Sequence, residues 1–95
     1  MPRVLDDLEG ILRTRRDDPP AEGSYSADLL RDPERTQRKI MEEAFEVCLE
    51  LGREHLDAER IASEAADLVF HLLVGLVAAD VPFSAVLDEL AARRR

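Results

Sequence analysis

Two groups of acidic residues in the middle of the sequence have spacings that suit metal binding. Glu42, Glu43 and Glu46 form the first group, and Glu64 and Asp67 form the second. Residues three or four positions apart lie on one face of a helix, so each group can present carboxylates to one side. Sites made only of oxygen ligands select hard cations. If the groups meet, they predict a site for Mg²⁺, with Mn²⁺ as a substitute.

The two groups meet only if the helices that carry them pack against each other. Antiparallel packing across the connection 52–57 places residues equidistant from its centre face to face, which brings Glu43 and Glu46 near Glu64 and Asp67. Four carboxylates then converge, enough to hold one metal ion or more than one. The alternative is a solvated acidic edge, which explains a glutamate-rich helix face without any ligand.

Two neighbours of these acids are candidates for a role in catalysis. Glu42 lies about 100° around the helix from Glu43, so it is a metal ligand, a base that orients water, or a group behind the ligands. Lys39 is the only lysine and lies on the acidic face. It either holds a substrate phosphate as a point charge or pairs with Glu42 or Glu43.

Several other residues have a functional and a structural interpretation. His71 lies one turn after Asp67, so it contacts that carboxylate or is a hydrogen-bonded core histidine. The segment 24–26 caps a helix, packs at the edge of the core, or meets a nucleotide. Cys48 is expected in the core. Four arginines are candidates for phosphate binding, although most of the arginines must be surface charge: Arg13, Arg31, Arg35 and Arg38.

The elements that must position these residues are all helices. Apolar residues recur at helical spacing, and no segment alternates as a strand does. Prolines, glycines and capping residues divide the pattern into four to five helices. We expect helices over 4–16, 24–30 (capped by Ser24 or Ser26), 33–51 (capped by Asp32 and ended by Gly52), 58–79 (capped by Asp57), and from Ser84, as a cap, to about 92.

Length and charge limit the functions that this chain can have. Its 95 residues suit one domain, residues 1–95, and its net charge of −8 argues against binding to nucleic acid or to an anionic membrane. One cysteine, a charged N-terminus and an uncharged run of only twelve residues (68–79) favour a cytoplasmic protein without a membrane span, which takes roughly 20 apolar residues.

The distribution of apolar residues predicts self-association. The helix over 33–51 is apolar over a wide arc, and 68–79 is apolar all round. One chain of this length has too few other helices to cover both. We therefore expect a homodimer or a larger homo-oligomer, whose copies complete a shared bundle core.

The acidic pattern resembles a known signature. Glu42-Glu43-Ala44-Phe45-Glu46, followed by Glu64-Ala65-Ala66-Asp67, is similar to the Glu-Glu-x-x-Glu … Glu-x-x-Asp motif of the all-α, MazG-like nucleotide pyrophosphohydrolases. Residues 24–30, Lys39 and residues 67–74 resemble one branch, the phosphoribosyl-ATP pyrophosphohydrolases of histidine biosynthesis. The chain departs from the usual pattern of this branch at Ser26, Met41 and Phe70, none of which is an expected ligand.

The resemblance implies a fold, a reaction and a set of site residues. The fold is a MazG-like helical bundle completed by dimerisation, and the reaction is hydrolysis of phosphoribosyl-ATP to phosphoribosyl-AMP and pyrophosphate by Mg²⁺-activated water. The metal ligands are then Glu43, Glu46, Glu64 and Asp67, with Glu42 and Lys39 as catalytic residues.

Two other functions are compatible with the same residues. A house-cleaning dNTP pyrophosphohydrolase has the same fold and metal site, although residues 24–30 and Phe70-His71 argue against it. A non-catalytic helical dimerisation module explains the apolar faces but not the second acid pair, Glu64 and Asp67.

Overall fold

A computed structural model describes residues 3–94, and it contains five helices and no strand within this range. The all-α prediction is therefore confirmed. The helices follow one another as α1 (Val4–Asp17), α2 (Tyr25–Leu30), α3 (Pro33–Leu51), α4 (Ala58–Ala78) and α5 (Phe83–Arg93).

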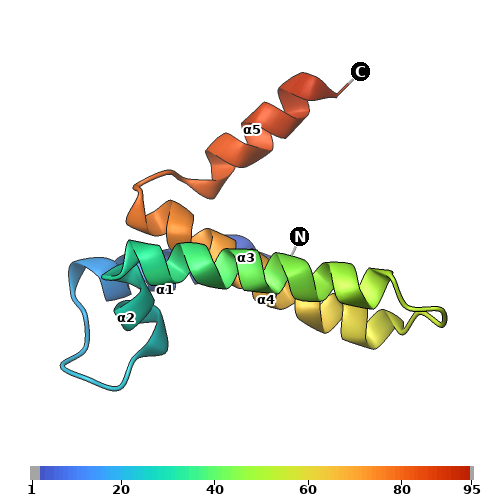
Figure 1. Ribbon diagram of the computed structural model, residues 1–95. Coiled ribbons are helices and arrows are strands. Elements are labelled where there is room, and N and C mark those ends of the chain that lie inside the picture. The colour runs from blue at the N-terminus through green and yellow to red at the C-terminus, as the bar shows by residue number, and fades with distance from the viewer. Residues whose placement is uncertain (1–2, 95) are drawn as a thin grey trace.

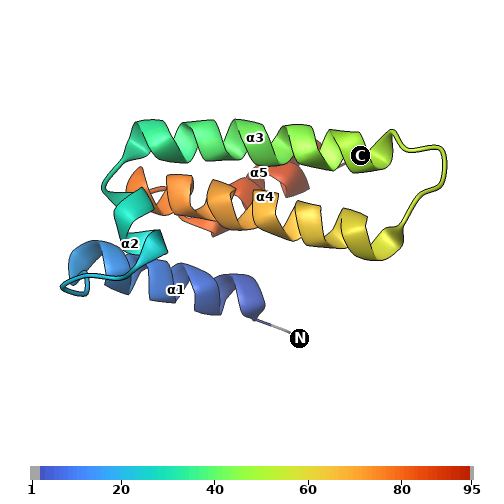
Figure 2. The same cartoon turned by 60° about the horizontal axis from the view of Figure 1, so that its bottom comes forward.

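The two long helices α3 and α4 form an antiparallel hairpin (Figures 1 and 2). Helices α1 and α2 pack at the end of the hairpin that is remote from its connecting loop, and α5 diverges from it. The hydrophobic core lies at this packed end and is made by α1, α2 and α4: Leu12, Leu29, Leu30, Leu73, Val74 and Val77.

Local capping explains where three of the helices begin. The side chain of Ser24 accepts a hydrogen bond from the Ala27 N–H, that of Asp32 from the Arg35 N–H, and that of Asp57 from the N–H groups at the start of α4. These contacts satisfy backbone donors that a helix leaves open at its first turn. The predictions of these three caps are confirmed.

The last helix begins differently from the prediction. Ser84 is not its cap, because α5 starts at Phe83 and Pro82 occupies the capping position. The Phe83 N–H instead donates to Glu9 Oε2 of α1 at 2.9 Å. A carboxylate 74 residues away thus supplies the acceptor that the local sequence lacks.

Contacts near both ends of the hairpin set how α3 and α4 lie against each other. Near its open end, a Cβ added at Gly75 would lie 3.3 Å from Ile40 Cδ1, so the glycine permits close approach. Near the connecting loop, the buried Glu50 accepts two hydrogen bonds from Arg53, at 2.9 and 3.1 Å, and Arg60 of α4 lies 3.6 Å away. The acidic residues of interest lie between these two contacts.

Large parts of the long helices are exposed in the single chain. Cys48 is exposed, so the expectation that it lies in the core is wrong for one copy of the chain.

Among residues 3–94, α4 alone is long and apolar enough to cross a membrane, with a mean hydropathy of 1.7. The shorter run considered from sequence did not reveal this. Core helices of soluble proteins share this length and hydropathy, so these two properties alone do not assign a membrane span to α4.

The capping of α4 leads to a prediction about stability. Replacing Asp57 with Ala removes the acceptor for the Glu59 and Arg60 N–H groups, so we expect the free energy of unfolding to fall by about 1 kcal/mol. Asp57→Asn is the matched control, because asparagine caps as well as aspartate does. Urea unfolding at one protein concentration measures both. Equal losses in the two variants would contradict a capping role.

Candidate metal centre

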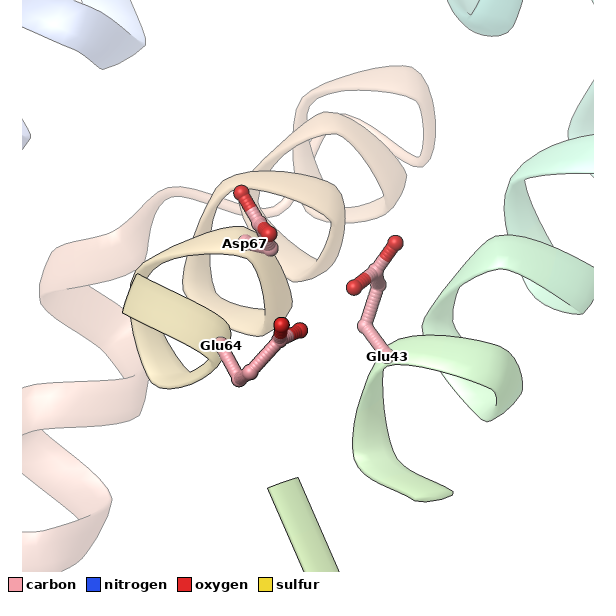
Figure 3. A group of neighbouring side chains, drawn as sticks. All are labelled: Glu43, Glu64 and Asp67. Atoms are coloured by element: carbon pink, nitrogen blue, oxygen red, sulfur yellow. The ribbon is translucent and has the colours of Figure 1, made fainter. Parts of the chain in front are cut away.

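Three carboxylates converge between α3 and α4. One oxygen each from Glu43, Glu64 and Asp67 lies within 4.8 Å of the others. Figure 3 shows Glu43 pointing from α3 toward Glu64 and Asp67, which project from α4. The hairpin therefore brings together three of the four expected ligands, as antiparallel packing across the loop predicts.

The carboxylates become more exposed from Glu43 to Asp67. Glu43 is buried, Glu64 is half-buried and Asp67 is exposed. This gradient leaves the centre accessible from one side, where Asp67 lies. A site that is buried at Glu43 and open to solvent at Asp67 suits an ion that must also bind a ligand from solution.

Two carboxylate oxygens in this centre have no hydrogen-bond partner. Oε2 of Glu43 and Oε2 of Glu64 are both buried and accept no hydrogen bond from residues 3–94. A buried acceptor without a partner costs about 1–3 kcal/mol, and more when it is charged. Both oxygens belong to residues of the cluster that can hold a cation, and a cation bound there would be a partner for carboxylates that the protein leaves unsatisfied.

Lys39 is the cation beside this centre. Its Nζ donates to Glu42 Oε2 at 3.1 Å and lies 3.5 Å from Glu43 Oε1. The bond to Glu42 raises the pKa of Lys39, so the ammonium stays charged at neutral pH. The predicted ion pair is thus present, with both glutamates. One lysine leaves the three clustered carboxylates with an excess of negative charge.

The structure places Glu42 and Glu46 outside the group of three. Glu42 is exposed and holds Lys39. Glu46 lies one turn beyond Glu43 and is also exposed. By contrast, Glu50 is buried on the same helix but is neutralised by Arg53 and Arg60.

His71 bonds to the backbone of Asp67 and not to its carboxylate. Its Nδ1 lies 2.7 Å from the Asp67 carbonyl oxygen, which can only accept, so Nδ1 carries the proton. Nε2 then accepts from the Tyr25 hydroxyl at 2.8 Å. Of the two predicted roles, the hydrogen-bonded core histidine is therefore confirmed, and the contact with the carboxylate is absent. The buried histidine joins α2 to α4 next to a candidate ligand.

Most of the arginines considered for phosphate binding are paired with acids close by in the sequence. Arg13, Arg31 and Arg38 lie 2.7–3.4 Å from acids three or four residues away. Arg35 lies over the ring of Tyr25, 5.5 Å from its centroid. Arg15, which no sequence pattern distinguishes, donates to Ser26 Oγ at 2.8 Å.

Comparison with known proteins gives the family. Residues 5–94 match the family described as phosphoribosyl-ATP pyrophosphohydrolase. A phosphoribosyl-ATP pyrophosphatase of Methanosphaerula palustris is 51% identical over 80% of this chain and 78% of its own length. One from Caulobacter sp. (strain K31) is 43% identical over 95% and 81%.

A two-function relative shows the same likeness in part of its length. The histidine biosynthesis bifunctional protein HisIE of Pyrococcus furiosus is 41% identical over 97% of this chain, which corresponds to 42% of that protein. Residues 5–94, which match the family, include α3 and α4, the helices that carry the three clustered carboxylates. The all-helical fold is consistent with these matches, and by its sequence the chain belongs to the phosphoribosyl-ATP pyrophosphohydrolase family.

Proposed function

We propose that this chain hydrolyses phosphoribosyl-ATP to phosphoribosyl-AMP and pyrophosphate, as a step of histidine biosynthesis in the cytoplasm. Membership of the family supports the reaction. The observation that carries the mechanism is the group of three carboxylates, two of which have a buried oxygen without a partner. A polyanionic substrate can approach such a group only when cations neutralise it.

The metal in this proposal is Mg²⁺, for which Mn²⁺ can substitute. Glu43, Glu64 and Asp67 hold it, and Glu46 is the fourth ligand, since it follows Glu43 by one turn and its exposed side chain is free to turn inward. The donors are all carboxylate oxygens, the ligands that hard cations prefer. When bound, the ion would act as a Lewis acid, lower the pKa of a bound water molecule and neutralise the leaving pyrophosphate.

Lys39 and Glu42 contribute protein charge beside the metal ligands. Lys39 binds a substrate phosphate, for which its ammonium is already placed 3.5 Å from Glu43. Glu42 now holds this lysine and is exposed. When the lysine turns to phosphate, the Glu42 carboxylate becomes available to orient the attacking water.

Product analysis tests the reaction. The protein is incubated with phosphoribosyl-ATP and Mg²⁺, and the products are separated and identified. We expect phosphoribosyl-AMP and pyrophosphate in equal amounts. Preferred turnover of dNTPs would instead make the chain a dNTP pyrophosphohydrolase, and no turnover of either substrate would favour a non-catalytic dimerisation module.

Metal binding is predicted to stabilise the fold. Mg²⁺ or Mn²⁺ should raise the melting temperature relative to Na⁺ at equal ionic strength, because the ion satisfies the open oxygens of Glu43 and Glu64. Glu64→Gln should abolish the shift and leave the metal-free protein at least as stable, since one like charge is lost. Glu46→Gln should weaken the shift. A full shift in Glu64→Gln would contradict the ligand set.

Lys39→Gln separates phosphate binding from simple ion pairing. If Lys39 binds phosphate, the variant should have a kcat/KM about a hundredfold lower than the wild type. If Lys39 only forms an exposed ion pair, the variant should keep its kcat/KM and lose only about 0–1 kcal/mol of stability. Mg²⁺ affinity should stay equal or rise, because a positive neighbour of Glu43 is removed. An unchanged kcat/KM would show that Lys39 only forms ion pairs with Glu42 and Glu43 and does not bind phosphate.

We also propose that the partner of the long hairpin is a second copy of this chain. Met41, Phe45 and Leu49 recur every four residues on α3 and are 72%, 63% and 52% exposed. Leu72 of α4 is 38% exposed as well. Monomers rarely leave a continuous apolar stripe of this kind in water, and a homodimer or a larger assembly buries it.

The assembly prediction is checked by light scattering. At micromolar concentration we expect at least a dimer, and Phe45→Glu should shift the mass toward the monomer because it puts a charge in the apolar stripe. Val4→Glu is the control, since Val4 is 69% exposed but belongs to α1. A folded wild-type monomer would refute the proposal.

A further inference from the structure

A concave site lies between α1, α2 and α4. An open pocket of about 440 Å³ is bounded by α1, the loop that follows it, the start of α2, and Phe70 of α4. Its walls are apolar at Ile11 and Phe70 and polar at Arg15, Ser24 and Tyr25, and the loop also contributes one acid, Glu22. A pocket of this size, with few polar groups placed on apolar walls, is typical of small-molecule sites.

Two arginines next to this pocket have no carboxylate partner. From Arg13 to Arg93, every other arginine lies within ion-pair distance of an acid in the described chain. Arg15 is held by the hydroxyl of the buried Ser26, and Arg35 by the ring of Tyr25. In a protein with a net charge of −8, cations held by neutral groups leave their charge available to an anion from solution.

A chain of contacts links the pocket to the metal centre. The Tyr25 hydroxyl donates to His71 Nε2 at 2.8 Å, and His71 Nδ1 donates to the carbonyl of Asp67 at 2.7 Å. Phe70 packs edge-on against the His71 ring, with 5.1 Å between their centroids. Of the residues that line the pocket, Phe70 therefore lies about one helical turn after Asp67, a candidate metal ligand, and Tyr25 is linked to the same turn through His71.

The chemistry of the substrate requires two anion sites. Phosphoribosyl-ATP carries a triphosphate at one end and a phosphate monoester, on its second ribose, at the other end. The carboxylate centre, with its cation, takes the triphosphate. The second phosphate needs a positive group away from the metal, with space between the two for the purine and the sugars.

We propose, resting on the function proposed above, that this pocket binds the phosphoribosyl end of the substrate. Arg15 binds the phosphate of that end, and Tyr25 and Phe70 contact the base. The guanidinium presents paired donors to a phosphate, and aromatic rings suit a purine. Arg15 thereby distinguishes phosphoribosyl nucleotides from ordinary ones.

The test compares two ligands without any divalent metal. Phosphoribosyl-AMP has the second phosphate and AMP lacks it, so the ratio of their dissociation constants isolates the proposed subsite. We expect the wild type to prefer phosphoribosyl-AMP, and Arg15→Gln to weaken its binding by about tenfold to a hundredfold while AMP binding stays unchanged. Arg38→Gln is the control, because Arg38 pairs with Glu34 on the exposed side of α3.

Three outcomes keep this inference separate from the proposed reaction. If Arg15→Gln binds phosphoribosyl-AMP as the wild type does, the subsite is wrong even where the protein hydrolyses phosphoribosyl-ATP. If the wild type binds phosphoribosyl-AMP preferentially but hydrolyses nothing, the reaction is wrong and the subsite stands. If Arg15→Gln melts at a lower temperature than the wild type, Arg15→Lys is measured as well, because it keeps the positive charge. A charge-based role is overturned if Arg15→Lys loses as much binding of phosphoribosyl-AMP as Arg15→Gln does, while Arg38→Gln loses none.

Discussion

The structure depends on holding three carboxylates together against their mutual repulsion. Glu43, Glu64 and Asp67 bring oxygens within 4.8 Å of one another, and one lysine beside them offsets only part of the charge. Two like charges about 4 Å apart repel by roughly 1 to 4 kcal/mol, depending on the water around them. Without a bound cation, the centre therefore weakens the fold, and the packing of α3 on α4 must oppose it.

The hairpin opposes this repulsion with contacts on both sides of the centre. At the loop end, Glu50 is buried and paired with Arg53 and Arg60, so its charge does not add to the centre. At the other end, Gly75 lets α4 approach α3, and the hydrophobic core fills the space between α1, α2 and α4. These contacts determine which carboxylates face each other across the hairpin.

Charge is divided between two neighbouring regions of the molecule. The acidic centre suits a cation, while the segment 24–26 holds Arg15 and Arg35 without neutralising them. The hydrogen bonds from Tyr25 to His71 and on to the Asp67 backbone join the two regions. A substrate with phosphates at both ends is complementary to this arrangement in charge.

The sequence by itself determined the helices and the acidic faces that they carry. Caps at Ser24, Asp32 and Asp57 act on backbone groups two or three residues away, so local patterns predict them, and the spacing of the acids predicts which faces carry charge. Only the tertiary structure decided what depends on contacts between distant segments. Examples are the cap that Glu9 gives α5, the bond from Arg15 to Ser26, and the exposure of Cys48, none of which has a signal in the residues nearby. The spacing likewise treats Glu43, Glu46 and Glu50 alike, because it describes one helix and not its neighbour. Packing against α4 made the first a member of the carboxylate group, left the second exposed and placed Arg60 beside the third.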